Sequence, residues 1–301
     1  MQKKRILFIG ASKYGNHGDD AYLDIFNEYL GDEYELIFTH PYPDLNLVDI
    51  ADYLVMGGGG LIYNNSSQHF NYMTAYLERA IAKNIPFAFI GCGVQVKTKE
   101  PEAEWHKQLA KWKKYFEKAE MITVRSKAGL ELIRLISKDA NVKYYPDLVY
   151  LIKPVNYHFF DKSKKYFVFI PTNTDGKGVK FRGLWNKYKP QGKRRIILTM
   201  AQEEKELALS LANEINQHRG LNEFLHVTPQ EACRIIKDSY LTITCRYHGL
   251  IMANAMNKEA ISCDTRFKSI VEINPEDTQQ ALGHIDELKK LLDNHFLNNG
   301  K

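Results

Sequence analysis

Short apolar segments alternate along the chain with longer segments whose apolar residues have a helical spacing. In the first half the apolar segments lie at 6–10, 34–40, 52–57, 85–91 and 121–125, and most end in a glycine or a polar residue. Helical patterns lie between or after them, at 19–30, 69–84, 101–118 and 126–137. Because buried parallel strands are apolar on both faces and are joined by helices, this alternation predicts a Rossmann-type α/β domain.

The same alternation starts again after a segment without periodicity. Residues 153–165, KPVNYHFFDKSKK, have the composition of a linker. Apolar segments follow at 166–170, 195–200, 223–227, 240–245 and 260–264, with helical patterns near 202–218, 229–238, 248–257 and 278–296. We therefore predict an α/β fold of two Rossmann-like domains, 1–152 and 153–301, that face a central cleft, with the last helix, 278–296, packing back on the first domain.

Composition narrows the class of protein. The 301 residues include 41 basic and 36 acidic ones, a net charge of +5 without a long run of one sign, so nothing requires a nucleic-acid partner. The four cysteines include no CxxC pair and suggest neither a zinc site nor a disulfide framework. The start of the chain has too few apolar residues for a secretory signal, and no apolar run approaches the roughly 20 residues that span a bilayer. We expect a reduced, cytoplasmic protein.

The clearest chemistry lies between Tyr240 and Lys268. This stretch predicts a strand, a turn that carries Arg246 and His248, a helix, a second strand and a loop that carries Lys268. Ligands of α/β sheets bind where strands end, and helix N-termini favour anions there. A lone histidine or lysine is more often structural or solvated, but three such groups in one strand–helix–strand unit predict an anion site formed by Arg246, His248 and Lys268.

A run of glycines follows a strand in the first half, in the sequence MGGGGLIYN at 56–64. Consecutive glycines carry a high backbone entropy cost, which is tolerated where the backbone approaches a ligand or another segment closely. Gly58, Gly59 and Gly60, with the nearby Asn64, are therefore predicted to face the substrate. A plain turn is the alternative.

The first strand is followed by the loop ASKYGNHGDD, which opens a helix. It matches neither a dinucleotide-binding GxGxxG motif nor a P-loop. Asn16 is a candidate for substrate binding and Asp19 for catalysis, with a simple capped turn as the alternative interpretation. We expect His17 to be exposed.

Arg125 ends the segment 121–125 and is followed by a predicted helix. Its planar guanidinium suits a carboxylate or a phosphate, so it is a candidate for substrate binding. The alternative is an ion pair with a carboxylate on the rim of the sheet.

Residues 105–118 predict a helix with Trp105, Leu109, Trp112 and Phe116 on one face and lysines elsewhere. Such a helix could rest on the inner face of an anionic cell membrane. The alternative is a helix whose apolar face packs in the core and whose lysines are solvated.

Taken in chain order, these motifs resemble the polysaccharide pyruvyl transferase family over most of the chain. The matching motifs are an NxGDxA-like element (Asn16, Gly18, Asp19, Ala21), a GGG element (Gly57 to Gly60), a GxG element (Gly91, Gly93), a VR element (Val124, Arg125), a strand-end aspartate (Asp147), and an RxHG element with a downstream lysine (Arg246, His248, Gly249, Lys268). The last of these is the most specific. The chain is short for the family, and Cys92 and Gln95 stand in a loop that often reads GQGIGP in the family.

The resemblance implies a fold like that of GT-B glycosyltransferases. It also implies transfer of the pyruvyl unit of phosphoenolpyruvate onto a sugar of a cell-surface polysaccharide or its lipid-linked precursor, which forms a ketal and releases phosphate. Arg125, His248 and Lys268 match the family's phosphoenolpyruvate-site residues. We expect the first domain to hold the acceptor and the second the donor.

Residue chemistry adds roles to this picture. His248 is the best candidate acid or base because an ordinary histidine titrates near pH 6.5, while Asp19 is a candidate base for the acceptor hydroxyl. No metal and no cofactor other than the donor substrate are expected, because cationic side chains can carry the charge. Two alternatives stay open: a GT-B glycosyltransferase that uses a nucleotide sugar, and a non-catalytic sugar-binding protein.

Overall fold

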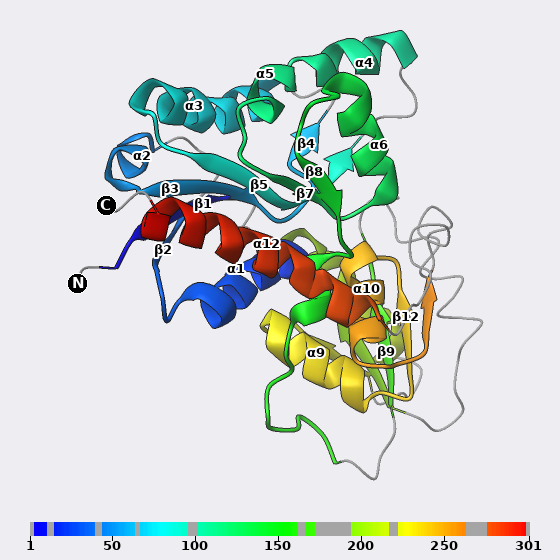
Figure 1. Ribbon diagram of the computed structural model, residues 1–301. Helices are drawn as coiled ribbons and strands as arrows, with labels where there is room; N and C mark the ends of the chain where they lie inside the picture. Colours follow the sequence, from blue (N-terminus) through cyan, green and yellow to red (C-terminus); the bar gives the residue numbers. More distant parts are fainter. Residues whose placement is uncertain are drawn as a thin grey trace. The chain divides into compact units, whose positions relative to one another are not determined.

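In the computed structural model the chain divides into two compact units, each built on a parallel sheet (Figure 1). The structure describes residues 3–10, 15–39, 44–63, 67–95, 102–161, 166–172, 194–216, 222–262 and 276–298. Unit 1 comprises 1–13, 22–148 and 276–301, and unit 2 comprises 14–21 and 149–275. The chain therefore changes unit at 148/149, close to the predicted linker, and a short early segment groups with the second half.

Unit 1 contains a six-stranded parallel sheet of order β2-β1-β3-β5-β7-β8. Its strands are β1 (Arg5–Ile9), β2 (Glu35–Thr39), β3 (Tyr53–Gly57), β5 (Phe87–Cys92), β7 (Ile122–Val124) and β8 (Val142–Tyr144). A short parallel pair, β4 (Ile62–Tyr63) and β6 (Val94–Gln95), follows β3 and β5. Every residue of β3 and β5 is buried, which explains why these segments are apolar throughout.

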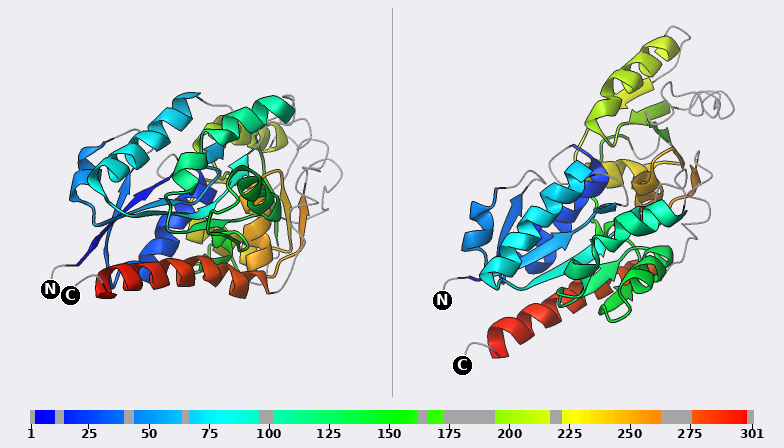
Figure 2. Two further views of the ribbon diagram at one scale, coloured as in Figure 1. Left: turned by 45° about the horizontal axis from the view of Figure 1, so that its top comes forward. Right: turned by 90° about the horizontal axis from the view of Figure 1, so that it is seen from above.

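Helices cover both faces of the unit 1 sheet. They are α1 (His17–Leu30), α2 (Asn46–Ile50), α3 (Ser67–Lys83), α4 (Glu102–Ala110), α5 (Lys113–Phe116), α6 (Lys127–Ile136) and α12 (Asp277–Asn298). Figures 1 and 2 show α3 and α5 on one face and α12, drawn in red, on the other. The last helix of the chain is thus part of unit 1.

The segment predicted as one helix over 105–118 is divided into α4 and α5. Leu109 and Trp112 are fully buried and Phe116 is 1% exposed, and Trp112 packs against Phe70 and Phe116 with ring centroids 5.1 and 6.2 Å apart. The hypothesis that this apolar face rests on a membrane is therefore wrong for these three residues. No helix in the described ranges is both long and apolar enough to cross a bilayer.

Unit 2 contains a five-stranded parallel sheet of order β11-β10-β9-β12-β13. Its strands are β9 (Tyr166–Ile170), β10 (Arg194–Leu198), β11 (Asn222–Leu225), β12 (Leu241–Thr244) and β13 (Ala260–Ser262). Its helices are the 3-10 helices η1 (Leu148–Leu151), which starts at the boundary with unit 1, and η2 (Gln202–Glu204), followed by α8 (Lys205–Asn216), α9 (Pro229–Asp238) and α10 (Tyr247–Ala255). Two α/β units with parallel sheets confirm the predicted fold class.

The described cysteines include both free thiols and a disulfide-bonded residue. Cys92 and Cys233 are buried free thiols, and burial raises the pKa of both. Cys245 is disulfide-bonded, so the expectation of reduced cysteines throughout is wrong at this position.

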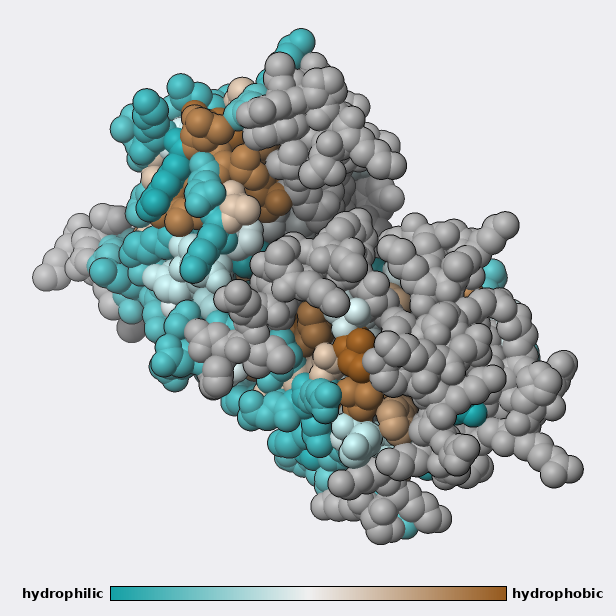
Figure 3. Space-filling model, turned by 90° about the vertical axis from the view of Figure 1, so that its right-hand side faces the viewer, coloured by the Kyte–Doolittle hydropathy of each residue, from teal (hydrophilic) through white to brown (hydrophobic). Residues whose placement is uncertain are grey.

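Large apolar side chains are exposed at several places along the described chain. Figure 3 shows one face of the molecule, on which apolar groups are bordered by hydrophilic residues. The large apolar side chains that are exposed among the described residues are Leu45, Ile50, Leu135, Tyr157, Leu209 and Tyr240. They come from several different elements.

Candidate functional site

The RxHG element lies at the carboxyl end of β12, in the turn that leads into α10. The hydroxyl of Thr244 accepts a hydrogen bond from the backbone N–H of Arg246 and donates one to its carbonyl, both at 3.0 Å, which fixes the turn. A Cβ atom on Gly249 would lie 2.4 Å from Thr244 Oγ1 and 2.9 Å from Ile170 Cδ1. Only glycine therefore lets α10 pack this closely on the strand ends, which explains the glycine of the RxHG element.

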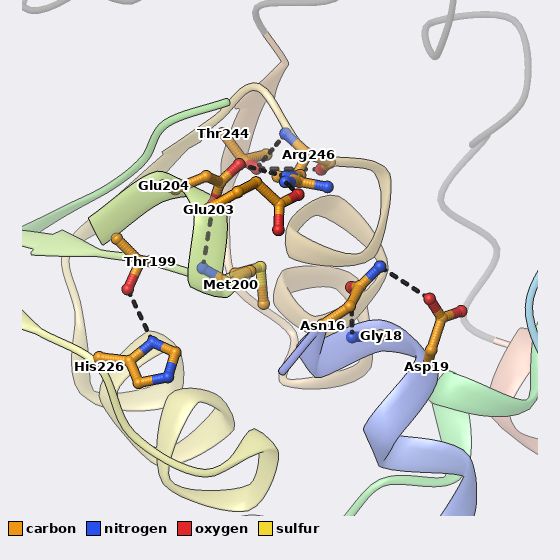
Figure 4. A network of polar contacts seen from close by, with 10 residues as sticks. All are labelled: Asn16, Gly18, Asp19, Thr199, Met200, Glu203, Glu204, His226, Thr244 and Arg246. Carbon is orange, nitrogen blue, oxygen red and sulfur yellow. Dashed lines mark hydrogen bonds and ion pairs between the residues drawn. The ribbon is translucent and has the colours of Figure 1, made fainter. Parts of the chain in front are cut away.

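Arg246 is held by two glutamates of η2, which follows β10 (Figure 4). Its Nε donates to Glu204 Oε1, and its Nη2 donates to Glu203 Oε1 at 3.1 Å. The Glu204 side chain is fully buried and also accepts from the backbone N–H of Met200 at 3.3 Å. Burial raises the pKa of Glu204 to about 6, although Arg246 acts in the opposite direction.

The loop before α1 lies at the same edge of the unit 2 sheet. Asn16 forms an antiparallel bridge with Ala201, and the backbone N–H of His17 donates to the carbonyl of Met200 at 2.8 Å. The backbone N–H of Gln202 donates to the Gly15 carbonyl at 3.1 Å. The early NxGD element and the late RxHG element are thus brought to one edge.

His248 lies directly against this loop. A Cβ atom on Gly18 would be 1.7 Å from His248 Nδ1 and 2.2 Å from its Cγ, so the imidazole rests on glycine backbone. Asn16 Oδ1 accepts from the N–H of Gly18 at 3.2 Å, and Asn16 Nδ2 donates to Asp19 Oδ2 at 2.7 Å. Asn16 therefore caps α1 and orients Asp19, while a contact of either residue with substrate stays a prediction.

His17 is buried, with 3% exposure, so the expectation that it is exposed is wrong. Its Nε2 bonds the carbonyl of Val227, and its ring stacks on His226 with centroids 5.4 Å apart. Burial, helped by the charges of His226 and Arg246, lowers the pKa of His17 to about 4. His17 is therefore uncharged at neutral pH, and its hydrogen bonds hold the loop against the ends of β10 and β11.

In unit 1, Arg125 follows β7 and forms a buried ion pair. Its Nη1 donates to Asp147 Oδ2 and to the Tyr22 hydroxyl, both at 3.0 Å, and that hydroxyl donates to Asp147 Oδ1 at 3.0 Å. The side chains of Arg125 and Asp147 are 13% and 1% exposed. Arg125 thus forms an ion pair with a carboxylate, but the pair is buried and includes a tyrosine that the sequence did not indicate. A contact of Arg125 with substrate stays a prediction.

A second network of hydrogen bonds connects residues near the strand ends of unit 1. Thr123 Oγ1 accepts from the N–H of Gly91 at 2.9 Å and lies 2.7 Å from His284 Nδ1, while His284 Nε2 lies 3.0 Å from the Pro146 carbonyl. This pattern fixes the tautomer, with Nε2 as donor and Nδ1 as acceptor. Complete burial lowers the pKa of His284 to about 4, although the Asp147 carboxylate opposes the shift.

The glycine loops of unit 1 approach other parts of the same unit. Gly58 and Gly59 have positive φ values of 76° and 70°, and a Cβ atom on Gly58 would lie 2.3 Å from Tyr22 Cδ2. A Cβ atom on Gly93 would lie 2.7 Å from Arg125 Nε. These features explain Gly58, Gly59 and Gly93 locally, while a contact of Gly58, Gly59 or Gly60 with substrate stays a prediction.

Two predicted site residues, Asn64 and Lys268, lie outside the described residues. Within the described ranges, no group of three or more histidine, cysteine, aspartate or glutamate residues is arranged to hold a metal ion. Unit 2 brings Asn16, Asp19, Arg246 and His248 to one sheet edge, and Arg125 belongs to unit 1.

Several solved structures share the fold at low sequence identity. A UDP co-structure of MnaA from S. aureus has 13% identity and a TM-score of 0.58, covering 96% of this chain and 89% of that one. UDP-GlcNAc 2-epimerase from Neisseria meningitidis has 11% identity and a TM-score of 0.51, covering 97% and 93%. An alpha-glucosyltransferase in complex with UDP and DNA has 12% identity and a TM-score of 0.53, covering 96% and 91%. These similarities show a GT-B-like fold.

Sequence comparison identifies the family. No curated protein matches the chain. A family model described as polysaccharide pyruvyl transferase matches residues 16–266, a range that begins at Asn16 and includes both the VR and the RxHG elements. The chain belongs to the polysaccharide pyruvyl transferase family.

Proposed function

We propose that this protein transfers the pyruvyl unit of phosphoenolpyruvate onto two hydroxyls of a sugar, which forms a ketal and releases phosphate. The observation that carries the proposal is the family match over residues 16–266, which spans nearly all the candidate residues. The family description supports a polysaccharide as the acceptor. We propose that the sugar belongs to a cell-surface polysaccharide or to its lipid-linked precursor.

The chemistry of the unit 2 edge supports a donor with two anionic groups. Arg246 precedes α10 and its own side chain does not cap this helix. Backbone N–H groups at a helix N-terminus are suited to an anion. A guanidinium can bind a carboxylate or a phosphate through two parallel hydrogen bonds. Resemblance to the family adds Arg125 and Lys268 as further donor-site residues.

The proposed reaction needs an acid and a base. A proton is added to C3 of phosphoenolpyruvate as one sugar hydroxyl attacks C2, which gives a methyl group and a phosphorylated hemiketal. The second hydroxyl then replaces phosphate at C2, and its proton leaves with a base. His248 is the proposed acid, because it occupies the first turn of α10 beside Arg246. Asp19 is the proposed base for the acceptor hydroxyl.

Phosphate release from phosphoenolpyruvate in the presence of an acceptor glycan tests this function. His248→Ala should abolish release while the thermal unfolding midpoint stays near that of the unaltered protein. Arg246→Ala should also abolish release, but its midpoint should fall, because the buried carboxylate of Glu204 loses its cation. Lys237→Ala, which removes an exposed cation of the same unit, should leave release unchanged. A His248→Ala variant that folds and turns over normally would remove this residue from the mechanism.

Nucleotide-sugar transfer is the competing function, because the similar structures include complexes with UDP. Ligand binding to the folded state raises the unfolding midpoint. We expect phosphoenolpyruvate to raise it and UDP to leave it unchanged. The reverse pattern would favour a glycosyltransferase.

A further inference from the structure

The two glutamates that hold Arg246 differ sharply in their surroundings. Glu204 is fully buried, bonds Nε of the guanidinium, and is tied to the backbone N–H of Met200. Glu203 bonds Nη2 at 3.1 Å and its side chain is 63% exposed. The carboxylate of Glu204 therefore lies in the protein interior, and the carboxylate of Glu203 lies at the surface.

This pairing has an electrostatic consequence for anion binding. A guanidinium shared by two carboxylates has an excess of negative charge around it, so an incoming anion must displace one of them. An exposed ion pair is weak and is readily exchanged. A buried carboxylate is exchanged much less readily, because breaking a buried ion pair leaves a buried charge without its counter-ion.

The atoms involved decide which glutamate can be exchanged. With Nε held by Glu204, the outer edge of the guanidinium, formed by Nη1 and Nη2, is the edge that binds a carboxylate or phosphate through two hydrogen bonds. Glu203 occupies Nη2, and within the described ranges no residue accepts from Nη1. An anion that displaced Glu203 would gain both donors.

We propose that Glu204 is the positioning residue that fixes Arg246 for the donor, and that Glu203 occupies the place which the carboxylate or phosphate of phosphoenolpyruvate takes when it binds. The inference rests on the proposed function, and it deepens that function by giving opposite roles to two adjacent residues. Glu204 strengthens donor binding through Arg246, and Glu203 competes with the donor.

Acidity should affect the two roles differently. Burial raises the pKa of Glu204 to about 6, and the charged groups that act on this carboxyl are Arg246 and Glu203. Below that pH the carboxyl is protonated and holds the guanidinium more weakly, so the KM for phosphoenolpyruvate should rise. The contribution of this raised pKa to stability has the opposite sign: it is fully present below the unfolded value of about 4.5 and is lost as the pH rises through about 6. Acid should therefore weaken binding without weakening the fold through this group.

Steady-state kinetics of Glu204→Gln and Glu203→Gln test the inference, because the two variants remove the same charge from adjacent positions. At pH 8 we expect Glu204→Gln to raise the KM for phosphoenolpyruvate at least about tenfold, with a smaller effect on kcat. Glu203→Gln should lower this KM or leave it unchanged. Equal effects of both variants, or a Glu204→Gln variant with normal KM, would overturn the proposal.

The pH dependence is expressed as a ratio of two KM values, because the phosphate of the substrate also titrates near pH 6. The KM of Glu204→Gln divided by that of the unaltered protein should be large at pH 8 and approach one at pH 5. A ratio that does not change with pH would refute the positioning role of the ionised carboxylate. If Glu204→Gln does not fold, Glu204→Asp, which withdraws the carboxylate by one methylene, should raise KM in the same direction, and a normal KM in that variant would also refute the role.

A measurement without substrate separates failure of this inference from failure of the proposed function. In nitrogen-15 NMR, the Nε proton of Arg246 should exchange slowly with water in the unaltered protein and in Glu203→Gln, and rapidly in Glu204→Gln. Absence of phosphate release by the unaltered protein would reject pyruvyl transfer. Equal exchange rates in all three proteins would reject the role of Glu204, whatever the reaction.

Discussion

Gly18 offers the most direct test of how His248 is placed. The two residues lie 230 positions apart in the chain, and a Cβ atom added to Gly18 would be 1.7, 2.2 and 2.3 Å from Nδ1, Cγ and Cε1 of the imidazole. Non-bonded heavy atoms approach to about 3.5 to 4.0 Å, so Gly18→Ala must displace the ring by roughly 2 Å. The substitution should therefore move the proposed acid without removing it.

The expected size of the effect follows from this displacement. A misplacement of about 1 Å can lower an enzymatic rate by about 10²-fold. We expect Gly18→Ala to reduce kcat for phosphate release from phosphoenolpyruvate by at least about 10²-fold, and overpacking to lower stability by roughly 1 to 3 kcal/mol. The assay is initial-rate phosphate release with saturating acceptor, with a thermal unfolding scan of each variant.

A double variant provides the matched control. His248→Ala removes the ring that clashes, so Gly18→Ala combined with His248→Ala should be more stable than Gly18→Ala alone and no less active than His248→Ala alone. Interaction of this kind appears as a departure from additivity. Normal turnover by Gly18→Ala, or additive losses of stability in the double variant, would refute the stated contact between residue 18 and the imidazole.

Further predictions concern the buried polar groups. Asp147→Ala leaves Arg125, whose side chain is 13% exposed, without its counter-ion, so urea unfolding should show a loss of about 3–5 kcal/mol. Tyr22→Phe, which removes one hydroxyl from the same network, should cost only about 1 kcal/mol, and equal losses would contradict the assignment. The pKa values of His17 and His284 are lowered from 6.5 to about 4, so the stability each contributes is present above pH 6.5 and is lost as the pH falls through 4. Each can contribute up to about 3 kcal/mol, and urea unfolding of His284→Gln at pH 7 and pH 4.5 should show a smaller acid-induced loss than the unaltered protein. An identical loss in both proteins would show that this histidine does not titrate as stated.

Local patterns in the sequence predict much of the fold because buried parallel strands and their glycine-containing ends are local features. The RxHG element is placed as predicted, at a strand end before a helix. The capped start of α9 also follows from local spacing, since Thr228 and Glu231 form a capping box and Pro229 stands at the start of the helix. The helix over 105–118 is broken, which its continuous apolar face does not reveal.

The partners of the candidate residues could not be predicted, because they come from distant parts of the chain. Glu203 and Glu204 read as ordinary acidic residues before a helix, and only the order of strands in the sheet brings them to Arg246. Burial of His17 likewise depends on β10 and β11, which begin 177 and 205 residues later. His284 reaches Thr123 only because α12 belongs to unit 1. Roles in binding and catalysis for Arg125, Asp19 and Lys268 stay predictions.

Mass spectrometry of a glycan library incubated with this protein and phosphoenolpyruvate tests pyruvyl transfer most directly. Pyruvyl transfer predicts a product heavier than its acceptor by one pyruvate less one water, with one phosphate released for each ketal formed and neither product formed by His248→Ala. A folded protein that forms no pyruvylated product, but extends a glycan from a nucleotide sugar, would contradict it.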